Sequence, residues 1–330
     1  MKYLIFLVPF LLFSCGKKED VVTSTNQNLD SLLKVYPDSV ELLVLHGNKM
    51  IKNYRLELAL SDGAKAFRLD STNNEARLLY ADALNNRPNR SPEDVARAQN
   101  FYAFLLKKMP KEPKIYVSLA STYSQQMDFD KSFLYINQAL KINPRYRDAY
   151  VMKGSNYLVL NKIDLAKSSY ETAVQQDPKF FEAYLMLGSL YQAENDKICL
   201  EYYKTAAELQ PKNVDVIYSL AYAEQVFGQT YKAMAHYKRM LQLKPDYHQA
   251  LNQIGVIQQY DLNRIDSAIY YYNSALELEP RFVEAWHNLG TCYESQKDIT
   301  HALQSYAKAL KYDPSFELSR NRADALKGKR

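Results

Sequence analysis

Residues 285–314 read AWHNLGTCYESQKDITHALQSYAKALKYDP. This stretch holds two amphipathic segments joined by a polar turn, with apolar residues recurring every three or four positions in each segment. That period is typical of a helix with one buried face. The closing proline has no N–H with which to continue a helix, so the second segment ends there. The stretch therefore predicts one pair of antiparallel helices.

The same ending recurs along most of the chain. Successive prolines are separated by 34, 34, 33, 34, 35 and 34 residues, at Pro110, Pro144, Pro178, Pro211, Pro245, Pro280 and Pro314. A fixed period of this length is the pattern of a stack of like structural units. Globular enzymes do not space their prolines in this way.

The repeated unit resembles the tetratricopeptide repeat (TPR) family. In the quoted stretch, signature positions 4, 7, 8, 11, 20, 24, 27 and 32 of that family hold Trp286, Leu289, Gly290, Tyr293, Ala302, Tyr306, Ala309 and Pro314. The resemblance implies an all-α fold, a right-handed α-solenoid of helix-turn-helix repeats. About eight repeats are expected within a superhelix over 40–316, at 40–73, 74–112, 113–146, 147–180, 181–213, 214–247, 248–282 and 283–316. An N-terminal half-repeat helix over 26–39 and a polar capping helix over 317–330 are expected to flank them.

Close packing of the two helices explains the small residues of the pattern. Position 8 is Gly or Ala in every repeat, and position 20 is Ala, Ser or Cys. Helices approach to roughly 8–10 Å only where little side chain stands at the crossing. Position 24 is most often Tyr, which we expect to fill the core between repeats. The second repeat has five extra residues in its turn, where Ser91 is expected to cap the next helix.

The N-terminus has the pattern of a lipoprotein leader. Lys2 precedes an apolar run from Leu4 to Phe13, which is half of the roughly 20 residues that span a bilayer. The following residues, Leu-Phe-Ser-Cys ending at Cys15, resemble the lipobox that signal peptidase II cleaves in bacterial lipoproteins. We expect 1–14 to be a cleaved signal peptide and Cys15 to carry diacylglycerol and palmitate. A plain secretory signal that happens to contain a cysteine is the alternative.

The residues after Cys15 are polar and show no period, so 15–25 is expected to be a flexible tether. Lys18-Glu19-Asp20 resembles the export signal of surface lipoproteins in Bacteroidota. We therefore expect an outer-membrane lipoprotein of the cell envelope, either periplasmic or surface-exposed.

Composition and motifs give no indication of catalysis, of metal binding or of nucleic-acid binding. The 42 basic and 37 acidic residues are spread along the chain, without the clustered basic face that nucleic acid requires. The sequence has no glycine-rich phosphate loop and no histidine pair with metal-ligand spacing. Cys199 and Cys292 occupy positions for small residues, too far apart for a disulfide. We expect no enzyme activity, no cofactor, no metal and no nucleic-acid partner.

A stack of such helix pairs offers a groove for a protein or peptide partner. Positions 2, 5, 9 and 12 of the first helix are expected to line it. The sharpest candidates are Tyr218 and Tyr222, one helical turn apart, and the other candidate positions are Ser189, Asn252, Asn48 and Asp82. We expect a non-catalytic scaffold, an adaptor or assembly factor anchored to the membrane by lipid. An accessory lipoprotein that binds cell-wall enzymes or glycans is the alternative.

Overall fold

The computed structural model describes residues 29–328 of the 330-residue chain. The predicted signal peptide, Cys15 and the tether over 15–25 lie outside these residues. The described part divides into two compact units, one ending at Pro178 and the other beginning at Lys179, and each is described by itself.

Eighteen α-helices and one π-helical turn make up residues 29–328, with no β-strand among them. The first unit holds α2 (Leu29–Val35), α3 (Val40–Lys52), α4 (Leu56–Leu69), α5 (Asn74–Asn86), α6 (Pro92–Lys108), α7 (Pro113–Gln125), α8 (Phe129–Ile142), α9 (Arg147–Val159) and α10 (Ile163–Gln176). The second holds α11 (Phe181–Ala193), α12 (Cys199–Leu209), α13 (Val214–Val226), α14 (Thr230–Leu243), α15 (His248–Val256), η1 (Ile257–Asp261), α16 (Ile265–Leu278), α17 (Val283–Ser295), α18 (Ile299–Tyr312) and α19 (Glu317–Lys327).

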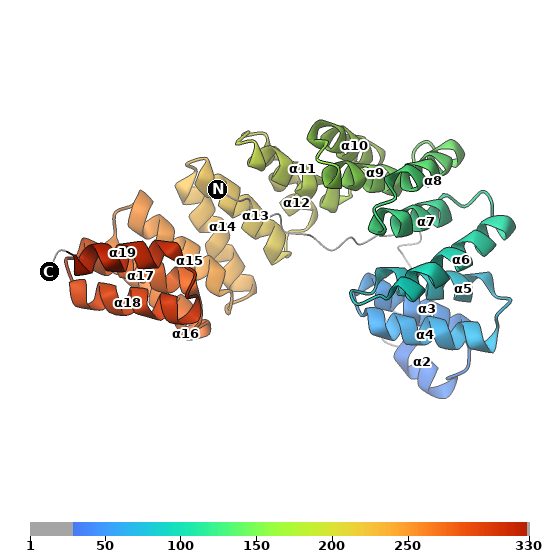
Figure 1. Ribbon diagram of the computed structural model, residues 1–330, viewed down its shortest axis with the longest axis horizontal. Coiled ribbons are helices and arrows are strands. Elements are labelled where there is room, and N and C mark those ends of the chain that lie inside the picture. The colour runs from blue at the N-terminus through green and yellow to red at the C-terminus, as the bar shows by residue number, and fades with distance from the viewer. Residues whose placement is uncertain (1–28, 329–330) are drawn as a thin grey trace. The chain divides into compact units, whose positions relative to one another are not determined.

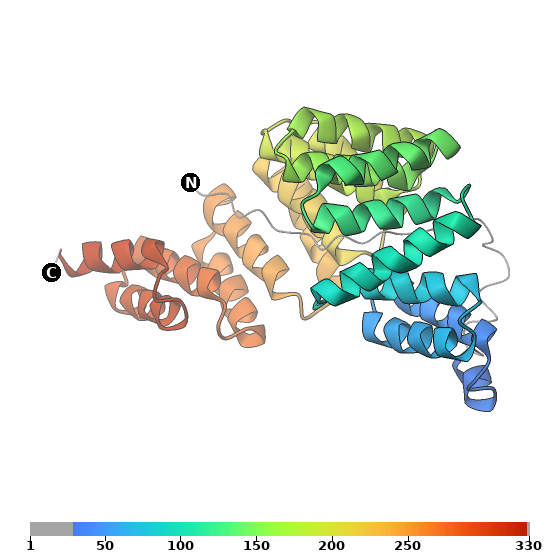
Figure 2. The ribbon, with the colours of Figure 1, turned by 45° about the vertical axis from the view of Figure 1, so that its right-hand side comes forward.

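Within each unit, consecutive helices pack as antiparallel pairs (Figure 1; Figure 2). The second helix of each pair also packs against the first helix of the next pair. The pairs are α3 with α4, α5 with α6, α7 with α8 and α9 with α10 in the first unit. In the second they are α11 with α12, α13 with α14, α15 and η1 with α16, and α17 with α18, followed by α19. The predicted all-α fold of repeated helix pairs is confirmed.

The turn inside a pair has one recurrent conformation. A residue with positive φ stands two residues after the first helix of the pair ends, at Tyr54, Met127, Asn161, Asn195, Gly228, Asn263 and Lys297. Asn and Gly adopt this left-handed conformation most easily. One such residue reverses the chain, so a turn of three residues is enough in six of these pairs, and five residues join α11 to α12.

The pair α5–α6 turns differently, because it contains the five extra residues. Ser91 Oγ accepts from the Asp94 N–H at 3.2 Å, and Asp94 Oδ2 accepts from the Ser91 N–H at 3.0 Å. This capping box confirms the predicted cap at Ser91. Arg87 lies 3.4 Å from both Glu57 and Asp94, so ion pairs hold the longer turn.

The core between the paired helices rests on a glycine and tyrosine contact. A Cβ on Gly188, Gly255 or Gly290 would lie 2.6 Å from a ring atom of the tyrosine at position 24 of the same pair. These rings are Tyr203, Tyr272 and Tyr306, all nearly inaccessible to solvent. Their hydroxyls donate to Gln192, Gln259 and Glu294 on the first helix, at 2.8–2.9 Å. The tyrosines therefore belong to the core, as predicted.

The one 35-residue proline interval has a structural counterpart. Helix α15 continues into the π-helical turn η1, where the N–H of Leu262 donates to the carbonyl of Ile257, five residues earlier. A π turn holds one more residue than an α turn. The extra residue of this repeat is thus absorbed inside its first helix.

Candidate partner-binding surface

The first helices of successive pairs form one side of each unit. Contacts join α3 to α5 and α7 to α9 in the first unit, and α11 to α13 in the second. Within residues 29–328 the backbones of the second helices of successive pairs approach less closely, although the rings of Phe67 on α4 and Phe101 on α6 touch, with centroids 5.0 Å apart. The layer with the closer backbone approach is the inner layer of a curved stack, so we expect positions 2, 5, 9 and 12 of the first helices to face inward.

Tyr218 and Tyr222 lie together on this inner side of α13. Their rings are parallel, with an interplanar angle of 4° and centroids 6.3 Å apart. Tyr222 is 40% exposed, whereas Tyr218 is half-buried against Tyr237 and Tyr247, at centroid distances of 5.8 and 6.1 Å. The outer ring of the predicted pair, Tyr222, is thus the more exposed, and the inner ring supports it.

Polar groups fix the orientation of this tyrosine cluster, which consists of Tyr218, Tyr222 and Tyr247. Gln253 Nε2 donates to the Tyr218 hydroxyl at 3.2 Å, and the Tyr247 hydroxyl donates to Asp215 Oδ1 at 3.4 Å. Burial raises the pKa of Tyr218, and burial together with the Asp215 charge raises the pKa of Tyr247 to about 12. Both hydroxyls therefore stay protonated near neutral pH and can donate hydrogen bonds.

Tyr247 is a member of the cluster that sequence reasoning missed. It occupies the last position of its repeat, just before α15. The same position is aromatic in most repeats, as Tyr146, Phe180, Phe282 and Phe316. That regularity was a usable signal, because an aromatic residue at a junction between pairs can reach the neighbouring first helix.

The structure separates the remaining candidate residues. Ser189 on α11 is exposed, and Asn48 on α3 is exposed in the first unit. Asn252 on α15 is buried, and its Oδ1 accepts from Asn288 Nδ2 at 3.1 Å. Asn252 therefore adds no exposed surface beside the tyrosine cluster.

Asp82 on α5 is buried in a network of the first unit. Its Oδ1 accepts from the Tyr102 hydroxyl at 2.8 Å and from the Ser118 hydroxyl at 3.3 Å. Lys114 Nζ lies 2.9 Å from its Oδ2. Burial, followed by the charge of Asp82, raises the pKa of Tyr102 far above its usual range. These bonds give Asp82 a structural role, because they join the pair α5–α6 to the pair α7–α8.

These features define a class of protein built from repeated antiparallel helix pairs. Models described as "Tetratricopeptide repeat" match residues 113–146, 148–180 and 283–316, and a "TPR repeat" model matches residues 258–297. The chain belongs to the tetratricopeptide repeat family. Proteins of this family are generally scaffolds for protein interaction, and the fold is typically non-catalytic.

Parts of this chain are similar in sequence to known proteins. "Tetratricopeptide repeat domain-containing protein PYG7, chloroplastic" of Arabidopsis thaliana is 37% identical over 82 residues, covering 25% of this chain and 27% of that protein. The chain thus spans about a quarter of that relative's length. "Photosystem I assembly protein Ycf3" of Synechococcus elongatus is 30% identical over 117 residues, covering 30% of this chain and 68% of that protein.

A solved structure shares the fold. The C-terminal part of a TPR repeat-containing protein from Cytophaga hutchinsonii superimposes with a TM-score of 0.59 at 19% identity. The match covers 73% of this chain and 97% of that one. Between residues 29 and 328, no helix is both long and apolar enough to cross a bilayer.

Proposed function

We propose that this protein is a membrane-anchored envelope lipoprotein that binds a protein or peptide partner and acts as an adaptor or assembly factor. Cys15 would carry the lipid, and the chain after it would place the helix pairs beside the membrane. The outer membrane is the proposed location. Anchoring rests on the sequence pattern at residues 1–20.

The observation that carries the binding role is the exposed ring of Tyr222 above Tyr218. A large apolar ring at 40% exposure loses unfavourable hydration when a partner covers it. Its support is already ordered by Tyr218 and Tyr247, so binding requires little loss of side-chain entropy. Tyrosines in this situation are typical anchors of protein interfaces.

Charged groups beside the tyrosine cluster indicate which side chains of a partner would fit there. Asp215 lies at the Tyr247 hydroxyl, and Lys244 Nζ lies 5.2 Å from the centroid of the Tyr247 ring. An apolar or aromatic side chain flanked by hydrogen-bond donors would suit this surface. The name of the Synechococcus relative, an assembly protein, supports an assembly role by analogy.

The binding role is tested by capture from detergent-solubilised membranes with Tyr222→Ala. We expect at least tenfold less of a defined partner than with the wild type, because truncating an interface anchor often costs about 2 kcal/mol. The matched control is Tyr231→Ala, which removes a 72%-exposed ring from α14. Equal capture by both variants would contradict the proposal, and recovery of a cell-wall hydrolase or glycan would favour the accessory role.

The anchor is tested separately with Cys15→Ala. We expect this variant to move from the membrane to the soluble fraction, because a thioether-linked diacylglycerol with a further acyl chain supplies the multiple-chain anchoring that holds a protein on a bilayer. Fractionation with and without high salt distinguishes lipid anchoring from charge attraction. If the variant stays in the membrane pellet at high salt, Cys15 is not the anchor.

A further inference from the structure

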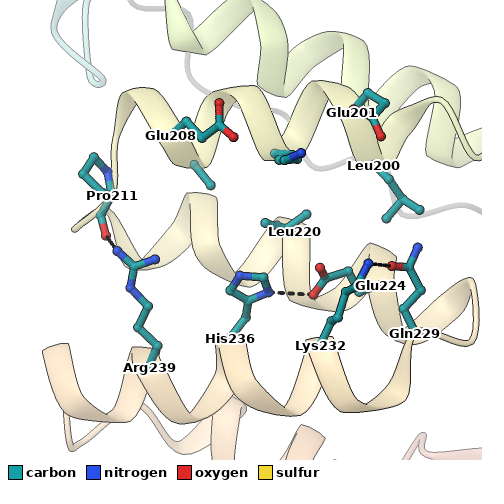
Figure 3. A pocket seen from close by; sticks show the side chains of 12 residues that line it. Leu200, Glu201, Glu208, Pro211, Leu220, Glu224, Gln229, Lys232, His236 and Arg239 are labelled. Atoms are coloured by element: carbon teal, nitrogen blue, oxygen red, sulfur yellow. Dashed lines mark hydrogen bonds and ion pairs between the residues drawn. The ribbon is translucent and has the colours of Figure 1, made fainter.

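A pocket of about 570 Å³ opens between α12 and α14, the second helices of two neighbouring pairs (Figure 3). Leu220 and Glu224 of α13 form its floor. Each follows a tyrosine of the cluster by two residues, and two residues advance a helix by about 200°. The pocket therefore lies on a different side of α13 from Tyr218 and Tyr222.

The pocket exists because one repeat departs from the pattern of the others at position 28. Ala207 occupies that position on α12. The other seven repeats fill it with a large apolar residue: Phe67, Leu106, Leu140, Val174, Leu241, Leu276 and Leu310. The missing side-chain volume opens the space above Leu220, which belongs to the same apolar cluster as Ala207.

A second departure places a charge in that space. Position 11 is Tyr in four repeats, and Glu224 is its only acidic residue. The Glu224 side chain is 7% exposed, and His236 Nδ1 lies 2.6 Å from its Oε2. Figure 3 shows the other carboxylate oxygen turned towards the pocket. His236 contacts only one of the two oxygens, so the other can still accept a hydrogen bond, and a bond from a charged donor is the stronger kind.

The charged side chains around Glu224 differ in whether they have a hydrogen-bond or ion-pair partner. Two basic side chains donate to neutral acceptors and keep their charge: Lys232 Nζ donates to Gln229 at 2.8 Å, and Arg239 donates to the Pro211 carbonyl at 2.7 Å. On α12, Glu201 and Glu208 are exposed at the rim, without an ion pair to any residue in 29–328. Lys204 is the third base of the lining, on a long exposed side chain.

We propose that this pocket binds an arginine or lysine side chain of a protein partner. The cationic head would meet the open oxygen of Glu224, and the aliphatic stem would lie on Leu220 and Ala207. Glu201 and Glu208 would attract the cation as it approaches. Lys204 can turn outward into solvent. The proposal stands whatever Tyr222 binds, because it concerns a separate surface.

The test is a titration of the purified chain with N-acetyl-argininamide and N-acetyl-lysinamide. Binding is measured by calorimetry and by the NMR signals of 13C-labelled histidines. We expect saturable binding of both probes with a dissociation constant on the order of 1 mM, as befits a small ligand. The His236 signal should shift as the probe fills the pocket. The neutral probe N-acetyl-glutaminamide should bind at least tenfold more weakly.

Two variants locate the binding. Glu224→Gln removes the charge, and Ala207→Leu fills the pocket with the residue that five other repeats carry at position 28. Each should weaken binding at least tenfold, and Ala207→Leu should melt no lower than the wild type. Asp246→Asn, an exposed acid outside the pocket, should bind as the wild type does.

Several results would overturn the proposal. They are the absence of saturable binding by the wild type, equal binding of the neutral probe, and unchanged binding by a folded Ala207→Leu variant. If Glu224→Gln does not fold, Ala207→Leu decides alone. A Tyr222→Ala variant should keep full probe binding, so failure here is distinguishable from failure of the inner-face proposal.

Discussion

At the scale of single residues, the fold depends on contacts that leave no room for one more carbon atom. Gly290 is the clearest case, because a Cβ there would lie 2.6 Å from Cε1 of Tyr306. The ring cannot withdraw easily, since it is buried and its hydroxyl donates to Glu294 at 2.9 Å. Such positions tie the sequence pattern directly to the distance between the paired helices.

We predict that Gly290→Ala destabilises the protein. In an open helix this change would stabilise by about 1 kcal/mol. Here we expect the free energy of unfolding to fall by about 1–3 kcal/mol, because the core is overfilled. Urea denaturation measures the difference. Adding Tyr306→Leu to the variant should recover part of the loss, and a stabilised single variant would show that the helices are not in close contact there.

At the scale of elements, the turns inside the pairs follow one backbone rule with different residues. Gly228 has φ of +74° and no atom within 4 Å of an added Cβ. Met127 has φ of +61° and is 63% exposed. At both positions a substitution changes the backbone strain of the turn with little change in side-chain packing.

We predict opposite effects at these two turns. Gly228→Ala should lower the free energy of unfolding by about 1–2 kcal/mol, the cost of a left-handed conformation for a residue with a Cβ. Met127→Asn should raise it by up to about 1 kcal/mol, because Asn relieves part of that cost. Thermal and urea unfolding of both variants check the signs. A neutral Gly228→Ala variant would mean that the turn relaxes to another conformation.

Much of this architecture was predictable because its signals are local and repeated. The proline period and the small residues at positions 8 and 20 indicated the helix pairs, and Ser91 indicated a cap. The location of the π turn was not predictable, since a 35-residue interval does not say which helix takes the extra residue. The partial burial of Tyr218 was also missed, because it depends on Tyr247 from the next repeat junction.

The pocket beside Ala207 was missed for a different reason. An alanine in a helix is unremarkable alone, and a glutamate such as Glu224 reads as a solvated residue. The two become meaningful only when their positions are compared with those of the other repeats and when α12 and α14 are seen to face each other. Sites formed by departures from a repeat pattern therefore need both the alignment and the structure.

At the scale of the whole molecule, both candidate surfaces belong to one of the two units. The tyrosine cluster and the Ala207 pocket lie in the unit that begins at Lys179, and the Asp82 network lies in the unit that ends at Pro178. Each unit consists of helix pairs that contact their neighbours, as expected of a linear repeat array. Both candidate surfaces can therefore be examined within the unit that begins at Lys179.

The central claim is that the inner face of α13 binds a protein partner. It is tested most directly by photo-crosslinking in living cells, with Tyr222→p-benzoylphenylalanine and, as the matched control, Tyr231→p-benzoylphenylalanine on exposed α14 surface. We predict that position 222 gives one adduct of defined mass in the membrane fraction and that position 231 gives none. Adducts from position 231 alone, or equal adducts from both positions, would contradict the claim.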